Sequence, residues 1–166
     1  MLHTMAIRKF TECWVPDFKK KPNLTGRLGH TSRTRLRIQY LGPLSRLKKE
    51  KLPVRNDLMV ILSGPEPQRT MLEDLLRSEL QSFKGNISFV RGVMQSERIT
   101  EIEGNITYHN FMQSEELQRT FNESKTVLCR SGYTTVMDLC CLGKSAFFIP
   151  TPGQYEQEYL AKKILF

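Results

Sequence analysis

Apolar residues gather in short continuous runs along the second two thirds of the chain, and each run is followed by a polar turn. Leu58–Leu62 is such a run, with Asn56-Asp57 before it and Ser63-Gly64-Pro65 after it. A continuous run of this length is typical of a strand that is buried on both faces of a parallel sheet. The same reasoning predicts further strands at residues 87–90, 105–109, 126–129 and 145–149.

Between these runs, apolar positions recur every three or four residues, which is typical of amphipathic helices. Helices are predicted at residues 66–82, at 113–122 with Ser114 as N-cap, at 134–142 closed by Gly143, and at 155–165. Residues 91–104 are polar and give no clear element. Strands that alternate with helices predict the α/β class, with a Rossmann-like parallel sheet, right-handed connections and helices on both faces.

The composition adds limits to this picture. With 166 residues, 39% hydrophobic and 25% charged, the chain is an ordinary globular domain with room for one appendage. No apolar stretch approaches the roughly 20 residues of a membrane-spanning helix, and the N-terminus lacks the apolar region of a signal peptide. Cys13, Cys129, Cys140 and Cys141 have neither disulfide nor zinc-site spacing, which favours a reducing cytoplasm.

The charge is unevenly distributed. Residues 1–55 contain 14 Lys and Arg against three acidic residues, whereas residues 56–166 are mildly acidic. We therefore divide the chain into a basic arm or linker, 1–55, and an α/β domain, 56–166. Such an arm is either a solvated surface or a segment that meets nucleic acid or anionic lipid head groups.

Ligands of open parallel sheets bind beyond the carboxyl ends of the strands. This rule directs attention to residues 63–67, 109–113, 130–134 and 150–156. In the first of these loops, Gly64 allows close backbone approach just before a helix start, where free N–H groups suit a phosphate. In the third loop, Arg130-Ser131-Gly132 leads into Thr134, and Ser131 is placed either to cap the helix or to bind a phosphate oxygen.

Two further positions carry candidate chemistry. Asp138 is a lone carboxylate in an apolar helix, where it either accepts both hydroxyls of a ribose or lies on an exposed face. Gln157 and Glu158 either hold sugar hydroxyls or form a polar helix start. Gly143-Lys144-Ser145 is not the end of a Walker A motif, because a helix precedes it and position 138 is not glycine.

Several of these residues form one pattern. The stretch from Cys129-Arg130-Ser131-Gly132 to Asp138, then Gly143, Ile149-Pro150 and Gln157, resembles the signature of family 28 glycosyltransferases. That family has the GT-B fold, two Rossmann-like domains of which the C-terminal one mainly holds the donor. The resemblance implies a ribose contact for Asp138, although the family has Glu there. It also implies Gly64 in the first glycine-rich turn, Phe111 and Met112 in the loop beside the uracil base, Ser131 and Gly132 at the phosphate-facing helix start, and Gln157 at the donor sugar. We add Arg130, Thr134 and Glu158, which adjoin these positions, to the expected donor-binding residues.

The resemblance also implies a reaction. We expect a UDP-sugar donor whose hexosyl or N-acetylhexosaminyl group passes to an acceptor, with no cofactor and no metal, in line with the absence of Asp-x-Asp. The catalytic base is unknown and is expected in an acceptor-binding domain that this chain lacks. The chain is then a fragment of a longer enzyme, inactive alone, or the donor-binding subunit of a two-chain enzyme. Its expected place is the cytoplasm, in peripheral contact with an anionic membrane at the inner face.

Two other function classes stay open at this point. One is a nucleotide-sugar 2-epimerase, which shares the fold. The other is a basic nucleic-acid-binding module that uses the arm, although nucleic acid is the less favoured partner because few aromatic residues interleave with the basic ones.

Overall fold

The structure, a computed structural model, describes residues 10–31, 37–94 and 97–164. Arg33 and Arg35 of the basic arm and the predicted helix end at residue 165 lie outside these ranges. No helix in the described ranges combines the length and apolar character needed to cross a membrane.

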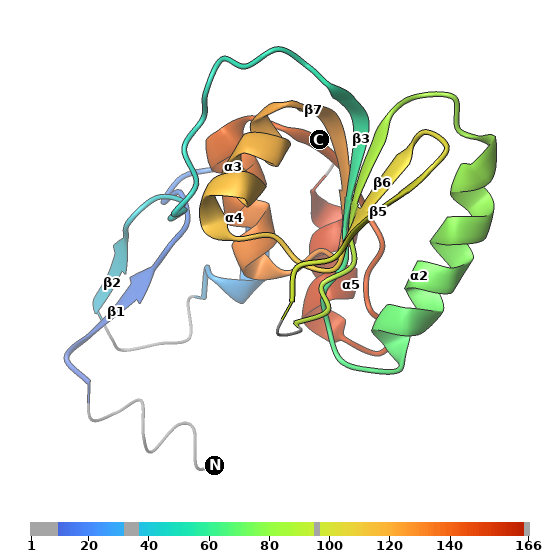
Figure 1. Ribbon diagram of the computed structural model, residues 1–166. Coiled ribbons are helices and arrows are strands. Elements are labelled where there is room, and N and C mark those ends of the chain that lie inside the picture. The colour runs from blue at the N-terminus through green and yellow to red at the C-terminus, as the bar shows by residue number, and fades with distance from the viewer. Residues whose placement is uncertain (1–9, 32–36, 95–96, 165–166) are drawn as a thin grey trace.

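A six-stranded sheet forms the centre of the molecule (Figure 1). Its strands lie in the order β5-β6-β4-β3-β7-β8. Their bounds are β3 Asn56–Ile61, β4 Ile87–Val90, β5 Thr100–Glu103, β6 Ile106–His109, β7 Ser124–Cys129 and β8 Ser145–Phe148. Strands β3, β4, β6, β7 and β8 pair in parallel, which confirms the predicted Rossmann-like α/β class.

Helices lie on both faces of this sheet, as predicted (Figure 1). They are α2 Gln68–Glu79, α3 Ser114–Asn122, α4 Tyr133–Leu142 and α5 Tyr155–Lys163. Alternate residues of β3 point in opposite directions: Leu58 and Val60 pack in the core on the α2 side, and Met59 packs with Leu139 of α4 on the other. This two-sided burial is the reason for the continuous apolar run in the sequence.

Three local predictions need correction. The polar stretch 91–104 contains β5, which pairs antiparallel with β6 at the edge of the sheet, so the sheet is mixed rather than wholly parallel. All four residues of β5 are exposed, so hydrophobic patterning gives no sign of it. Ser114 is the first residue of α3 and Gln113 its N-cap, while α2 begins at Gln68 rather than residue 66.

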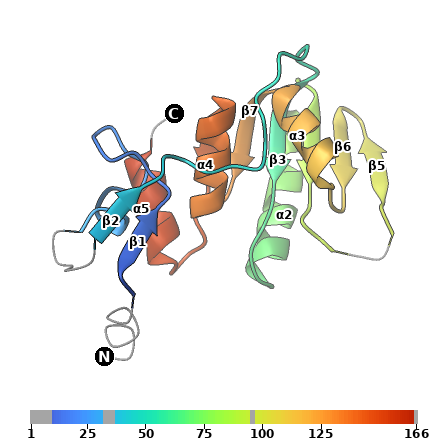
Figure 2. The ribbon, with the colours of Figure 1, turned by 90° about the vertical axis from the view of Figure 1, so that its left-hand side faces the viewer.

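The arm contains secondary structure that the sequence did not predict. β1 Glu12–Val15 and β2 Arg37–Tyr40 form a separate two-stranded parallel sheet, which stands apart from the six-stranded sheet (Figures 1 and 2). Between them, the wholly buried carboxylate of Asp17 accepts hydrogen bonds from the backbone N–H groups of Phe18, Leu24 and Thr25 at 2.7–2.9 Å. The Tyr133 hydroxyl of α4 donates to the Pro16 carbonyl at 2.7 Å, so the arm is attached to the domain.

Candidate functional site

Two adjoining pockets lie beside the starts of α3 and α4. One, about 580 Å³, is lined by Leu44, Ser45, Arg46, Thr134 and Asp138. The other, about 800 Å³, is lined by Arg46, Met94, Arg98, Phe111, Met112, Gln113, Ser114, Glu115 and Glu116. Because Arg46 lines both, we treat them as one depression and call it the edge groove. It brings together four of the predicted site residues, Phe111, Met112, Thr134 and Asp138.

The Asp138 carboxylate is half-buried in the edge groove and contacts the arm. The Ser45 hydroxyl donates to Asp138 Oδ1 at 2.5 Å and itself accepts from the Leu47 backbone N–H at 2.9 Å. A hydroxyl therefore already occupies one of the carboxylate oxygens. The second oxygen, Oδ2, has no hydrogen bond described, so the carboxylate keeps acceptor capacity for a polyol.

Arg46 is the residue that sequence reasoning missed. Its side chain is exposed, it lies between the Asp138 end and the Phe111 end of the groove, and it is in no salt bridge described here. The sequence offered no local signal for it, because it stands among other basic residues of the arm, for which the sequence predicted no strand or helix. A free cation beside a helix start is well placed to meet an anion.

The start of α4 is open. Gly132 is its N-cap with an extended backbone, and no side chain caps it. Ser131 was expected to cap this helix or bind phosphate, but its buried hydroxyl donates to the Gln157 carbonyl at 2.7 Å, so the capping prediction is wrong. The first backbone N–H groups of α4 therefore lack a side-chain acceptor, and its positive dipole end is available to an anion.

Arg130 is 4% exposed and acts as a clamp between three segments. Its guanidinium donates to the carbonyls of Ile149 and Pro150, which follow β8, at 3.1 and 2.9 Å, and to the Gln68 carbonyl in α2 at 3.1 Å. Burial without a carboxylate partner lowers the pKa of Arg130. Its predicted contact with the donor is not tested by this arrangement and stays a prediction.

The loop after β8 is held by the residues that were predicted to bind the sugar. The Gln157 amide oxygen accepts from the Thr151 backbone N–H, and the Glu158 carboxylate accepts from the Gly153 N–H, both at 2.9 Å. Thr151 is 3% exposed, and its hydroxyl has no hydrogen-bond partner among the described residues. The Thr151 hydroxyl oxygen lies 4.0 Å from the position that a Cβ would take on Gly64. The backbone of Gly64 has a φ of +113°, a conformation that favours glycine.

The start of α2 differs from that of α4, because a side chain already fills it. The Glu66 carboxylate accepts from the Thr70 backbone N–H at 3.2 Å, the Thr70 hydroxyl at 2.8 Å and Arg69 Nε at 2.7 Å. Hydrogen bonds from Thr70 and Arg69 lower the pKa of Glu66, so it stays ionised. An anion predicted beside Gly64 would have to compete with this carboxylate.

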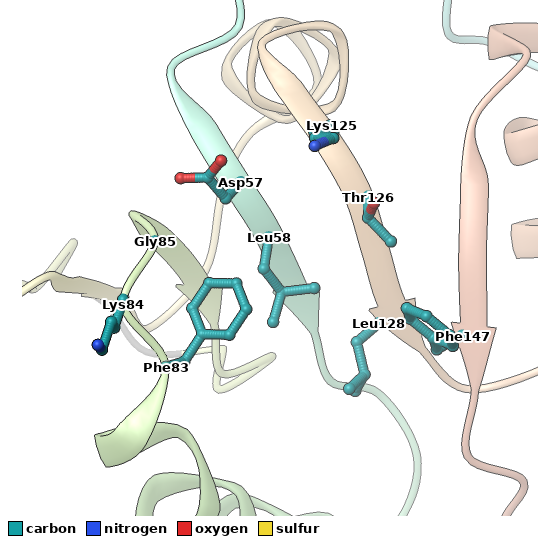
Figure 3. Close-up of a pocket in the computed structure, with 9 residues that line it drawn as sticks. All are labelled: Asp57, Leu58, Phe83, Lys84, Gly85, Lys125, Thr126, Leu128 and Phe147. Carbon is teal, nitrogen blue, oxygen red and sulfur yellow. The ribbon is translucent and has the colours of Figure 1, made fainter.

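A third pocket, about 630 Å³, lies away from these residues. Figure 3 shows it between the first residues of β3 and β7, on the face where α2 packs, lined in part by Asp57, Phe83, Leu128 and Phe147. No residue of the predicted site lines it. We therefore take the edge groove as the candidate functional site.

The mostly parallel sheet between two layers of helices, with its groove at two helix starts, defines a Rossmann-like domain, the class that binds nucleotides at this edge. Comparison with known families is more specific. The family described as "Glycosyltransferase family 28 C-terminal domain" matches residues 68–165. The chain belongs to glycosyltransferase family 28, which confirms the resemblance found in the sequence.

One curated relative matches clearly. It is the UDP-N-acetylglucosamine--N-acetylmuramyl-(pentapeptide) pyrophosphoryl-undecaprenol N-acetylglucosamine transferase of Nocardia farcinica, which is 26% identical over 117 residues. The match covers 69% of this chain and 31% of the relative, so the chain spans about a third of the relative's length. No solved structure matches the chain.

Proposed function

We propose that this chain is the donor-binding part of a glycosyltransferase that uses a UDP-sugar and transfers its hexosyl or N-acetylhexosaminyl group to an acceptor. Family membership supports the transferase class, and the relative's name specifies UDP-N-acetylglucosamine as the substrate of that protein. The observation that carries the proposal is the edge groove, in which the Asp138 carboxylate, the exposed Arg46 and the apolar side chains of Phe111 and Met112 adjoin an uncapped helix start. Two further acids, Glu115 and Glu116, line its α3 end, and Glu116 is paired there with Arg98.

Each part of a UDP moiety has a fitting partner in this groove. Asp138 would accept hydrogen bonds from the ribose hydroxyls, with Thr134 beside it. The N–H groups at the start of α4 and the Arg46 guanidinium would hold the diphosphate. Phe111 and Met112 would flank the base. Gln157 and Glu158 already hold backbone N–H groups, so any contact with the sugar would pass through the loop that they shape.

The chemistry follows from where charge develops. When the sugar leaves, negative charge grows on the diphosphate, and donors fixed in advance stabilise it more than they stabilise the intact donor. The α4 start and Arg46 would supply this stabilisation. The catalytic base that deprotonates the acceptor would come from an acceptor-binding domain or subunit.

The small sheet of β1 and β2 supports a second domain on that side. An isolated pair of strands is marginal, and parallel strands are normally covered on both faces. Trp14 is 63% exposed on β1, and Leu41, directly after β2, is 43% exposed. We infer that the acceptor-binding part, in the same or another chain, packs against β1 and β2. The relative's acceptor is linked to undecaprenol, a lipid, so we also place the reaction at a membrane surface.

The test is UDP binding measured by titration calorimetry. Asp138→Asn keeps the shape of the side chain but removes its charge, and a hydrogen bond to a charged group is worth about 1.5–3 kcal/mol, so affinity should fall about 10- to 100-fold. Asp74→Asn, the same change on an exposed position of α2, should leave affinity unchanged. Unchanged UDP affinity in a folded Asp138→Asn protein would contradict the ribose contact.

A further inference from the structure

Basic residues from two distant parts of the sequence meet at one corner of the molecule, which we call the basic corner. It consists of Lys19, Lys20, Lys21, Arg27, Lys162 and Lys163. All six are exposed, and none takes part in a salt bridge described here. The first four belong to the arm and the last two to the end of α5, which lie side by side in Figure 2.

Direct contacts hold the two segments together. Lys163 Nζ donates to the Asn23 carbonyl at 2.8 Å, and the Arg27 backbone N–H donates to the Tyr159 hydroxyl at 3.1 Å. Gly26 packs so closely on α5 that an added Cβ would lie 2.3 Å from the Tyr159 hydroxyl. Lys21, Arg27 and Lys163 line one shallow pocket of about 790 Å³. The corner is therefore built by packing.

The acids nearest to the corner in the chain form no ion pair with it among the described residues: Glu158, one turn before Lys162 in α5, accepts from the Gly153 N–H instead. Asp17, the acid nearest in sequence to the lysine run, is wholly buried and saturated with hydrogen bonds. Phe18, directly before Lys19, is 44% exposed, and Leu28, directly after Arg27, is 39% exposed. Cationic side chains beside exposed apolar ones are typical of surfaces that meet the interface of a membrane.

We propose that the basic corner docks on a membrane surface that contains anionic lipids. Lysines near such a surface each add to the attraction, while Phe18 and Leu28 reach the boundary between head groups and acyl chains. Nucleic acid fits less well, because single strands stack successive bases on several aromatic faces. The guanidinium of Arg27 lies 4.9 Å and 5.5 Å from the ring centroids of Tyr159 and Tyr155, which leaves Phe18 as the uncovered ring among the aromatic residues named here. The proposal extends the membrane location proposed above by naming the surface responsible.

The experiment is flotation of the full chain with vesicles of phosphatidylcholine alone or mixed with phosphatidylglycerol, without nucleotide. We expect binding to the mixed vesicles only, weakening as salt is added. The triple variant Lys19→Gln/Lys20→Gln/Lys21→Gln should lower partitioning about 100-fold. The matched control Lys48→Gln/Lys49→Gln/Lys51→Gln removes the same charge from exposed positions of the arm outside the corner, and it should keep most of the binding.

Three results would overturn the proposal: no flotation of the wild-type chain, equal loss in both triple variants, or an oligonucleotide retained at a salt concentration that abolishes vesicle binding. Circular dichroism confirms that each variant is folded. UDP affinity, measured separately, should be the same in both triple variants. The vesicle assay and the UDP assay can thus fail independently, which separates this proposal from the proposed function.

Discussion

Replacing Arg130 with methionine tests what the buried guanidinium does. Methionine keeps most of the side-chain length but has no donors, so the three carbonyls that Arg130 now holds lose their partner. Gln68 is exposed, and water can replace the guanidinium at its carbonyl. Ile149 and Pro150 are only partly exposed, so their carbonyls are the ones left poorly satisfied.

The expected cost follows from those two carbonyls. An unsatisfied buried acceptor costs about 1–3 kcal/mol. Partial access of water places each carbonyl in the lower part of this range, and the free energy of unfolding should fall by about 2–4 kcal/mol. Because the loop after β8 then loses its bonds to Arg130 and keeps the side-chain bonds from Gln157 and Glu158, it should also open more readily to proteases.

Urea unfolding followed by circular dichroism measures this change. Arg55→Met is the matched control, because Arg55 is largely exposed and its bond to Glu123 is 3.4 Å long, so less than about 1 kcal/mol should be lost. UDP affinity is measured on the same samples. If Arg130→Met unfolded at the same urea concentration as the wild type yet bound UDP at least tenfold more weakly, Arg130 would not stabilise the loop after β8. A direct contact between Arg130 and the donor would then be favoured.

Three further predictions rest on single residues. Thr151→Val removes a buried hydroxyl that has no partner among the described residues, so urea unfolding should show unchanged or slightly higher stability. Burial alone would raise the pKa of Asp17, but hydrogen bonds from Thr25, Leu24 and Phe18 outweigh it and lower that pKa. Its stabilisation is therefore complete above its ordinary pKa and lost as the pH falls through the lowered one, and Asp17→Asn should remove this acid transition in Trp14 fluorescence. Burial raises the pKa of Cys129 to about 12, so mass spectrometry should find Cys13 but not Cys129 alkylated in the folded protein at neutral pH.

The elements that could be predicted are those whose residues are buried, because burial requires apolar side chains in a regular pattern. Residues of β3 and β4 are buried on both faces, so their apolar runs mark them plainly. The edge strand β5 has no buried residue. Its pairing with β6 rests mainly on backbone groups, which every residue type carries, so the pairing leaves no hydrophobic pattern in the sequence. The strands β1 and β2 were missed for a related reason, because most of their residues are exposed or only half-buried.

The site could be predicted in part, because loop position follows from strand order but side-chain partners do not. Phe111, Met112, Thr134 and Asp138 meet in one groove, as expected for loops at one sheet edge. The hydroxyl of Ser131 and the amide of Gln157 instead bind neighbouring backbone. Arg46 reaches the groove from the arm, through a contact between segments far apart in the chain, which no local pattern encodes.

The two helix starts near the predicted site differ in a way that decides where a diphosphate would bind. Both helix starts offer free N–H groups, and the hydroxyl residues that follow Gly132 in the sequence already favoured the start of α4 as the anion site. At α2 the Glu66 carboxylate already accepts from Thr70, and a phosphate there would meet like charge. At α4 the N-cap is Gly132, which has no side chain to fill the position, and Arg46 adds a positive charge nearby. Electrostatics therefore favour the α4 start over the α2 start as the position of the diphosphate in the proposed function.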